Sequence, residues 1–256
     1  MLLCIDIGNT NIVMGLYDGS TLRGKARYTT STVRTVDECG LRADYLVRRF
    51  HPKKTVELDG VIICSVVPSL TPKMMDMARE YLYVEPIQVT SDLDIGVKIL
   101  TDNPSEVGAD RLVNALSAYR NSEKNCIIID FGTATTFDVV SAKGEYLGGA
   151  IAPGVETASR NLAARAAQLY SVDVRPPASV IGKNTTVSMQ SGIFWGQVEM
   201  LNGMIVRIED EIDDECTIIV TGGLGKIFVD SMDREATYDP DLTLEGLRLI
   251  YDELNG

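Results

Sequence analysis

The sequence predicts an α/β protein built from two similar domains. Three observations support this prediction: an internal repeat, an alternation of strand-like and helix-like segments, and a length suited to two cores. The chain has 256 residues, which is long for one compact core and comfortable for two smaller ones. Hydrophobic residues make up 45% and charged residues 23% of the chain, as in ordinary globular proteins.

The repeat consists of an apolar strand that ends in an acidic residue, a glycine turn and two further β-rich stretches. Its first copy has expected strands at 2–7, 12–17 and 21–28, and its second copy has them at 126–129, 137–140 and 145–151. The acidic residues of the two copies, Asp6 and Asp130, are 124 positions apart, close to half the chain. Duplication of a whole domain explains this spacing most economically.

The remaining segments alternate between the two periodicities. We expect strands at 58–67, 85–89 and 217–220, and helices at 36–50, 70–83, 103–119, 187–211 and 243–254. In the fourth helix of this series, Gly192, Gly196 and Gly203 indicate either a kink or close packing against another helix, within the chain or across a subunit interface. We place the domain boundary just before the second copy, which gives domains of residues 1–120 and 121–256.

The acidic strand ends suggest a site for phosphates. A charged Asp at the end of a buried strand is costly unless it faces a cleft or holds a cation. The glycine two residues later, in Asp6-Ile7-Gly8 and Asp130-Phe131-Gly132, leaves room for phosphate oxygens near backbone amides. One such turn is equally compatible with a plain β-hairpin, but two copies favour a clamp around a polyphosphate and its Mg²⁺.

A third glycine element follows the expected strand at 217–220. Thr221-Gly222-Gly223 would let a flat nucleotide base lie against backbone, because glycine carries no side chain. By itself the element is better explained as a turn between a strand and a helix, and only the two hairpins favour a nucleotide there.

The expected helix at 103–119, with Ser105 as its N-cap, carries two charged residues near its start. The helix dipole favours an ionised Asp110, which could accept a proton from a substrate hydroxyl. The neighbouring Arg111 could bind a substrate carboxylate in bidentate fashion. The alternative is that Asp110 only complements the dipole and that Arg111 is a surface charge.

Composition excludes several other classes of protein. A formal net charge of −12 argues against nonspecific nucleic-acid binding, which needs a basic surface. We expect no membrane span and no export signal, because no apolar run is long enough. The five cysteines contain no CxxC pair, so we expect buried, reduced thiols in a cytoplasmic protein. The single histidine, His51, makes histidine-based metal sites implausible, and we expect it at the surface of a helix end.

Taken together, these motifs resemble the type III pantothenate kinase family over essentially the whole length. The resemblance is carried, in chain order, by DIGNTN at 6–11, GADR at 108–111, DFGTAT at 130–135, GGAIAPG at 148–154, GKNT at 182–185 and TGG at 221–223. It implies two ribonuclease H-like domains, as in actin-like ATPases, on either side of a nucleotide cleft. It also implies a homodimer that transfers the ATP γ-phosphate to pantothenate, the first step of coenzyme A synthesis.

The resemblance assigns roles to matching residues. ATP would be bound by Thr133 and by Asp6, Ile7, Gly8, Asn9, Thr10, Asn11, Ile12 and Val13, beside the base contacts expected of Gly222 and Gly223. Pantothenate would be bound by Gly108, Ala109, Asp110, Arg111 and Thr185, with Asp110 as the catalytic proton acceptor and Thr185 reaching across the dimer interface. Asp6 would hold Mg²⁺, and Asp130 a monovalent cation, K⁺ or NH₄⁺. Metal ions suit a site with three aspartates, a triphosphate and no P-loop lysine.

The sequence departs from the family pattern at Thr101, where the family often has an aromatic contact to pantothenate. Two alternatives to the kinase remain open on this fold. A nucleotide-binding regulator that holds a protein partner would bind nucleotide without Asp110 and form no product. A phosphatase would place water at the pantothenate position and would not require Arg111.

Overall fold

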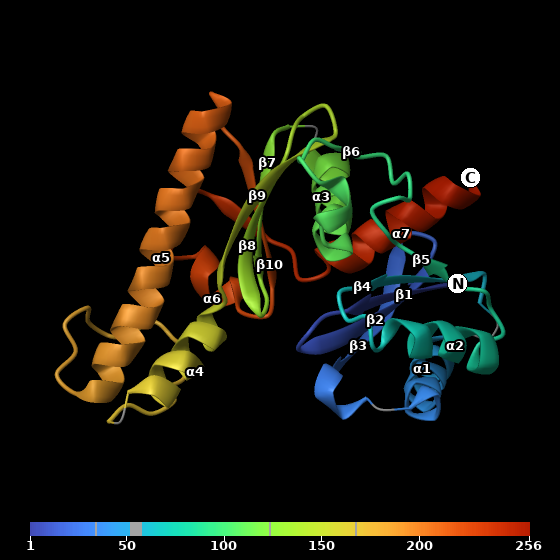
Figure 1. The fold of residues 1–256 in the computed structure, drawn as a ribbon, viewed down its shortest axis with the longest axis horizontal. Helices are drawn as coiled ribbons and strands as arrows, with labels where there is room; N and C mark the ends of the chain where they lie inside the picture. The colour runs from blue at the N-terminus through green and yellow to red at the C-terminus, as the bar shows by residue number, and fades with distance from the viewer. Residues whose placement is uncertain (34, 52–57, 123, 167) are drawn as a thin grey trace. The chain divides into compact units, whose positions relative to one another are not determined.

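Two β-sheets form the frame of the protein in the computed structural model (Figure 1). The structure describes residues 1–33, 35–51, 58–122, 124–166 and 168–256. The first unit comprises Met1–Ser117 and Asp241–Gly256, and the second comprises Ala118–Pro240. The division falls within helix α3, Ala109–Ser122.

The first sheet has the strand order β3-β2-β1-β4-β5. Its strands are β1 (Leu2–Ile7), β2 (Asn11–Asp18), β3 (Thr21–Thr29), β4 (Gly60–Ser65) and β5 (Ile87–Gln88). One face packs on α1 (Val36–Phe50) and α2 (Thr71–Tyr81) through alternating residues of β1, namely Leu3, Ile5 and Ile7. The short strand β6 covers Lys98–Ile99, and short 3-10 turns lie at Thr30–Thr32 and Pro104–Glu106.

The second sheet has the strand order β11-β10-β7-β8-β9-β6, and its strands β9-β8-β7-β10-β11 repeat the order of the first sheet. Its strands are β7 (Cys126–Phe131), β8 (Ala134–Val140), β9 (Glu145–Pro153), β10 (Thr217–Gly222) and β11 (Ala236–Tyr238). Its helices are α4 (Val155–Arg165), α5 (Thr185–Ile212) and α6 (Gly225–Val229). Phe131 of β7 stacks on Phe228, which stacks on Phe194 of α5, both with ring centroids 5.1 Å apart.

The predicted internal repeat is confirmed at the level of strand pairing. In both units an antiparallel three-stranded meander is followed by a strand parallel to its first member. Asp6 lies opposite Val13 and Asp130 opposite Thr136, so the two acids occupy matching positions. Each second hairpin also carries a register shift, after Leu16 and after Val139. The fold is therefore α/β with duplicated domains.

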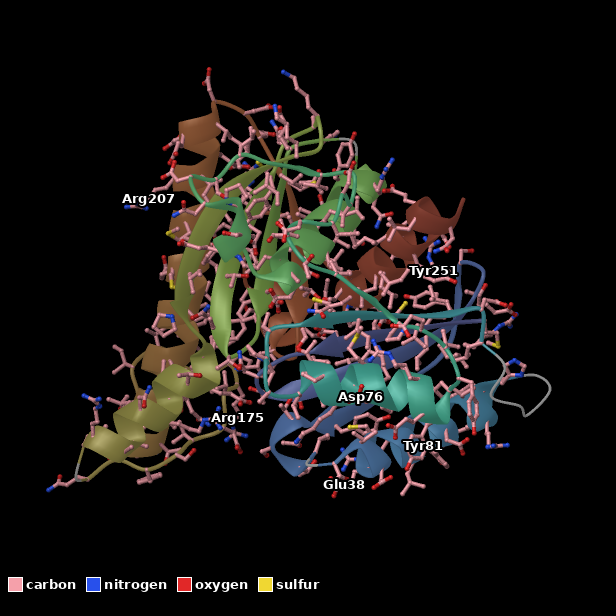
Figure 2. The ribbon with its side chains drawn as sticks, turned by 45° about the vertical axis from the view of Figure 1, so that its right-hand side comes forward. Glu38, Asp76, Tyr81, Arg175, Arg207 and Tyr251 are labelled. Carbon is pink, nitrogen blue, oxygen red and sulfur yellow. The ribbon has the colours of Figure 1, made fainter. Side chains whose placement is uncertain are left out.

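Helix α1 begins at a capping box that its sequence encodes. Glu38 donates its backbone N–H to the Thr35 hydroxyl at 3.2 Å and accepts from the Thr35 backbone at 3.1 Å, which satisfies two amides at the helix start. Tyr81 of α2 lies over Gly40, where a Cβ would come within 2.4 Å of its ring (Figure 2). The glycine thus sets the close approach of α1 and α2.

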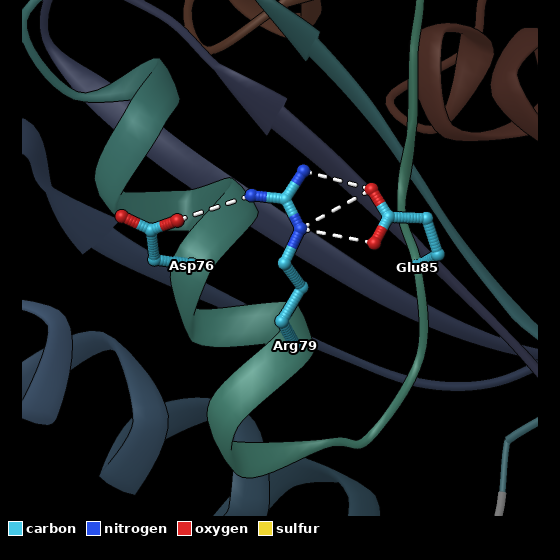
Figure 3. Close-up of polar contacts among 3 residues, drawn as sticks. All are labelled: Asp76, Arg79 and Glu85. Atoms are coloured by element: carbon cyan, nitrogen blue, oxygen red, sulfur yellow. Dashed lines mark hydrogen bonds and ion pairs between the residues drawn. The ribbon is translucent and has the colours of Figure 1, made fainter.

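A surface ion-pair cluster fixes the end of α2. Arg79 contacts Glu85 at 2.7 Å and Asp76 at 3.1 Å (Figure 3). The cluster ties the helix to the chain that leads into β5. Because all three side chains are exposed, solvent screens these ion pairs and they contribute little to stability.

Helix α7 (Leu242–Asn255) covers the other face of the first sheet. Gly60 of β4 makes room for the side chain of Tyr251, which is labelled in Figure 2. A Cβ added to Gly246 of α7 would lie 2.4 Å from the carbonyl oxygen of Val113, so the glycine allows α7 to approach that backbone closely. The sequence-based domain boundary assigned this helix to the second domain, whereas it packs on the first unit. The internal repeat predicts where the second domain begins. It does not predict that residues 241–256 pack on the first domain again.

Several smaller expectations can be compared with the structure. Four cysteines are buried and all five are free thiols, as predicted, with Cys216 partly buried. His51 does end α1, but it is only 7% exposed, so its expected surface position is wrong. Within the described residues, no helix is long and apolar enough to cross a membrane.

Candidate active site

Asp6 lies near the end of β1 on the sheet face opposite the α1–α2 core. Its neighbours Ile5 and Ile7 are fully buried, and Asp6 itself is half-buried. Its partner on the parallel strand β4 is Cys64. The alternation of the strand therefore turns one carboxylate away from the core, at the carboxyl edge of the sheet, where ligands commonly bind.

The turn that follows β1 is held from both sides. Gly8 donates its N–H to the carbonyl of Asn11 at 2.9 Å. Thr30, which follows the meander, donates its backbone N–H to Thr10 O at 2.9 Å and its hydroxyl to Gly8 O at 2.7 Å. Asn9 and Thr10 remain exposed at the tip. Thr30 therefore fixes the turn that is expected to receive phosphates.

Residues 6–13, which are expected to bind ATP, differ in how deeply their side chains are buried. The side chains of Ile7 and Ile12 are fully buried in the core of the first unit. Only their backbone groups could contact a ligand, whereas the side chains of Asn9 and Thr10 are exposed.

We expect Thr30→Val to raise the KM for ATP about three- to tenfold, because one hydrogen bond that fixes the turn is lost. Steady-state kinetics at varied ATP checks this. Thr32→Val is the matched control, because the Thr32 hydroxyl bonds Thr29 O at 2.7 Å in the same 3-10 turn without reaching Gly8. Equal KM values for the two variants would contradict the role assigned to Thr30.

Asp110 lies in the first turn of α3, which begins at Ala109. The expected N-cap at Ser105 is wrong, because residues Pro104–Glu106 form a separate 3-10 turn. The Asp110 carboxylate accepts a hydrogen bond from the Arg111 backbone N–H at 2.8 Å. Burial nevertheless raises the pKa of the Asp110 carboxyl above its ordinary value, against the lowering effect of that N–H and of the Arg111 charge. Burial thus outweighs the helix-dipole effect expected from the sequence.

The charges of Asp6 and Asp110 both affect one buried thiol of the first unit. Burial raises the pKa of the Cys64 thiol well above its ordinary value, and the charges of Asp6 and Asp110 raise it further. The two carboxylates therefore lie within electrostatic range of the same side chain, although they are 104 positions apart in the sequence.

A cavity of about 540 Å³ lies against the start of α3. Polar side chains from three segments face it, together with Gly108 and Ala109; they are Ser65, Thr71, Gln88, Thr90, Ser91, Ser105 and Glu106. A Cβ on Gly108 would lie 2.6 Å from the Asp110 carboxylate, so glycine there keeps the carboxylate in place. Thr101, the departure from the family pattern, has a buried hydroxyl without a hydrogen-bond partner among the described residues.

The second unit builds a similar corner around Asp130. Gly222, at the end of β10, adopts φ +86°, and a Cβ there would lie 2.5 Å from the Asp130 carboxylate and from Phe131 O. Gly223 donates its N–H to Phe131 O at 3.2 Å, and Tyr238 donates its hydroxyl to Gly222 O at 3.1 Å. The third glycine element thus lies directly against the strand end that carries Asp130.

The turn after β7 is held in the same way as the first turn. Gly132 donates its N–H to Ala134 O at 2.9 Å. The carbonyl of Thr133 accepts from Gly154 N–H at 3.2 Å and from the Thr157 hydroxyl at 2.9 Å. Both copies of the repeat therefore clamp their turn with residues that follow the third strand.

Thr185 begins the long helix α5, whose N-cap Asn184 accepts a hydrogen bond from Val187 N–H at 3.0 Å. Thr185 lines a groove of about 810 Å³ between α4 and α5. Gly192 and Gly196 also line it, and nothing among the described residues lies within 4 Å of a Cβ at either position. Thr185 belongs to the second unit and Asp110 to the first.

Two residues and one helix of this arrangement were missed by sequence reasoning. Thr30 and Thr157 hold the two turns, and their shared place just after each third strand was a signal that the repeat could have given. Helix α4, which carries Thr157, was also missed, because its apolar positions are few and Gly154 provides no side-chain cap.

Among the described residues, no three His, Cys, Asp or Glu side chains gather closely enough to hold a metal ion by themselves. Any cation at Asp6 or Asp130 would therefore share its coordination with ligand oxygens. That arrangement suits Mg²⁺, which is commonly bound by one or two carboxylates and substrate phosphates.

Comparison with solved structures identifies known proteins with a similar fold. The ROK hexokinase of Thermus thermophilus aligns with a TM-score of 0.52 and 11% identity over 99% of each chain. Together with the duplicated meanders, this likeness defines the class: a protein with two ribonuclease H-like domains of the actin-like ATPase type.

Sequence comparison narrows the class to one family. The family model of type III pantothenate kinase matches residues 2–207. Type III pantothenate kinases of Paramagnetospirillum magneticum and Desulfatibacillum aliphaticivorans are each 44% identical, over 98% and 100% of this chain and 96% and 99% of their own lengths. This chain belongs to the type III pantothenate kinase family.

Proposed function

We propose that this protein phosphorylates pantothenate with ATP to give 4'-phosphopantothenate, the first step of coenzyme A synthesis. Its family membership identifies the reaction. The observation that best supports the assigned chemistry is the position of Asp110 at the start of α3, where Gly108 lies against its carboxylate and also lines the polar cavity. A proton acceptor at that place suits a substrate hydroxyl bound in the cavity.

In this proposal Asp110 is the general base. As the primary hydroxyl of pantothenate attacks the γ-phosphorus, its proton passes to the Asp110 carboxylate. The new bond joins that oxygen to phosphorus, the bond to the β–γ bridging oxygen breaks, and ADP leaves. A carboxyl whose pKa is raised by burial is a stronger base than an ordinary aspartate.

Arg111, Gly108 and Ala109 are proposed to hold pantothenate in the cavity at the start of α3. The polar lining of that cavity suits the hydroxyl and amide groups of pantothenate, and Arg111 suits its carboxylate. The phosphates of ATP are assigned to the turn at Gly8–Thr10 and to Thr133, and the base to Gly222 and Gly223.

Two cations complete the proposed site. Mg²⁺ is assigned to Asp6, and a monovalent cation, K⁺ or NH₄⁺, to Asp130. The contact between Asp130 and Gly222 supports the second assignment, because it leaves the carboxylate at the strand end without side-chain bulk opposite it. When bound, the cations neutralise charge on the phosphates, which a protein of net charge −12 needs.

A coupled assay with purified protein, pantothenate, ATP and Mg²⁺ tests the function, run with K⁺, NH₄⁺ or Na⁺ alone. We expect phosphopantothenate to form with K⁺ or NH₄⁺ and to fall at least about tenfold with Na⁺, because Na⁺ is smaller and holds its water more tightly. Nucleotide binding without product under every cation would favour a regulator instead. Phosphate release without pantothenate would favour a phosphatase.

We also propose that the protein is a cytoplasmic homodimer joined along the groove between α4 and α5. The open space over Gly192 and Gly196 supports this proposal, as do exposed apolar side chains next to the groove, Leu162, Val180 and Ile181. The family resemblance assigns Thr185, at the start of α5, to the pantothenate of the partner subunit.

We expect Gly196→Arg to give a monomer with a raised KM for pantothenate, because the new side chain would fill the groove without a clash inside the described chain. Light scattering after size-exclusion chromatography reports the mass. Val206→Arg is the control, since Val206 lies on the same helix, is 50% exposed and does not line the groove. A Gly196→Arg dimer would place the interface elsewhere.

A further inference from the structure

The cavity at the start of α3, which is assigned to pantothenate, has no aromatic side chain among the described residues that line it. The family pattern often has an aromatic contact to the substrate at position 101, where this chain has Thr101. The Thr101 hydroxyl is buried without a hydrogen-bond partner among the described residues. Pantothenate carries two methyl groups beside an amide, a combination that suits an aromatic ring with a polar tip. Any aromatic contact to this substrate therefore comes from another segment of the chain.

Residues 168–184 form a long connection that leads into α5 without a helix or strand of its own (Figure 1). Connections of this length are uncommon in compact domains and usually serve a function. The Gln190 amide donates to the carbonyl of Asp173 at 3.1 Å, and the Ser191 hydroxyl donates to the carbonyl of Val180 at 2.5 Å. Gln190 and Ser191 are both buried. These hydrogen bonds hold the connection in a fixed position along the first turns of α5.

Tyr170 lies in this connection, beside the first turn of α5. Its hydroxyl is 2.6 Å from the hydroxyl of Thr186, the second residue of the helix. The preceding residue, Leu169, lines the same groove as Thr185. These two contacts bring residues 169–170 next to residues 185–186 within the second unit. Tyr170 is 52% exposed, so its ring keeps a free surface for a ligand.

We propose that Tyr170 is a pantothenate contact, which supplies the aromatic surface that residue 101 lacks. The inference rests on the proposed function, from which it takes the assignment of Thr185 to the pantothenate of the partner subunit. Because Tyr170 and Thr185 are held side by side in one unit, they reach the same substrate. The ring covers the methyl groups of pantothenate, and the Tyr170 hydroxyl, which can make more than one hydrogen bond, bonds the amide as well as Thr186.

A purely structural role for Tyr170 leads to a different expectation. If Tyr170 only held the start of α5, its hydroxyl contact with Thr186 would matter and its ring would not. Tyr170→Phe and Thr186→Val both remove the contact between the two hydroxyls and leave an aromatic ring in place. Tyr170→Ala removes the contact and the ring together. Comparison of these variants therefore separates a substrate contact from a contact that only supports the helix.

Isothermal titration calorimetry measures the Kd of a non-hydrolysable ATP analogue with Mg²⁺, and then the Kd of pantothenate in the presence of both. We expect Tyr170→Ala to raise the pantothenate Kd about tenfold, and Tyr170→Phe and Thr186→Val to raise it at most about threefold. The Kd of the ATP analogue should stay within about twofold for all three variants. Tyr45→Ala is the matched control and should change neither Kd, because Tyr45 is 62% exposed and its hydroxyl bonds Arg49.

An unchanged pantothenate Kd for Tyr170→Ala, or equal losses for Tyr170→Ala and Thr186→Val, would overturn the proposal. Thr101→Tyr in the Tyr170→Ala background should restore the pantothenate Kd to within about threefold of the wild type, because it returns an aromatic ring to the substrate. A correctly folded double variant without this gain would contradict the replacement of residue 101 by Tyr170. A wild type that binds the ATP analogue and no pantothenate would instead contradict the proposed function, so the two failures are distinguishable.

Discussion

Asp110→Asn is expected to lower kcat by about 10²- to 10⁴-fold, the usual contribution of a general base. The amide keeps the size of the side chain but cannot accept the proton of the pantothenate hydroxyl at neutral pH. Binding of ATP should change little, because the phosphate turn is held by Thr30 and not by Asp110. Stopped-time assays of phosphopantothenate and ADP titrations together separate the two quantities.

The same substitution should make the folded protein more stable at neutral pH. Burial raises the folded-state pKa of Asp110 above its unfolded value. The folded state therefore binds the proton more tightly, and the stability from this group is fully present below the unfolded pKa and lost as pH rises through the folded pKa. The neutral amide avoids that loss, so the Tm of Asp110→Asn at pH 7 should exceed that of the wild type.

The pH profile supplies a further check on the same residue. Wild-type kcat should fall on the acid side at a pH above the range of an ordinary aspartate, because the base must be ionised to act. Asp102→Asn, at an exposed position before α3, is the control and should change neither kcat nor Tm. A fully active Asp110→Asn enzyme would return this aspartate to the role of a helix-dipole partner.

Gly222→Ala has the second largest expected effect. The added Cβ would lie 2.5 Å from the Asp130 carboxylate and from the Phe131 backbone, at a φ of +86° that side chains rarely adopt. We expect a loss of about 1–3 kcal/mol in the free energy of unfolding, from backbone strain alone. Urea unfolding followed by circular dichroism measures it.

Gly222→Ala should also weaken the response to K⁺, because the Asp130 carboxylate must move to admit the new methyl group. Gly203→Ala is the matched control: its Cβ would meet only the flexible end of Arg207 at 3.2 Å, and a helical glycine generally gains stability on becoming alanine. Equal stability of the two variants would show that the β10 end tolerates a side chain, contrary to the contact geometry.

Sequence reasoning predicted the parts of the fold that repeat or alternate. The two meanders, the parallel strands after them and the helices α1, α5 and α7 follow from periodicity, because each buries one apolar face. Helix α4 and the 3-10 turn at Pro104–Glu106 were not predicted, since short, largely exposed segments carry little pattern. The buried position of His51 likewise depends on tertiary packing that one residue cannot reveal.

The site could be predicted in type more than in detail. Asp6 and Asp110 were singled out from strand and helix positions, and the charges of both raise the pKa of the buried Cys64 thiol. This shared effect on Cys64 could not be predicted from the sequence, because it depends on which residue of β4 lies beside Asp6 of β1. The roles of the Thr30 and Thr157 hydroxyls could not be predicted either. A threonine after a strand indicates no function until the structure shows its hydrogen-bond partner, here Gly8 O and Thr133 O.

The return of α7 to the first unit has a consequence for how the protein is made. Domains usually fold as units during synthesis, beginning with the N-terminal one. Here the sheet that contains β1 waits for residues 241–256, which are synthesised after the whole second unit, before Gly15, Gly60 and Val113 gain their packing partners. The first unit of the newly synthesised chain therefore stays incomplete until the second unit has been made, and loss of α7 would damage the unit that was begun first.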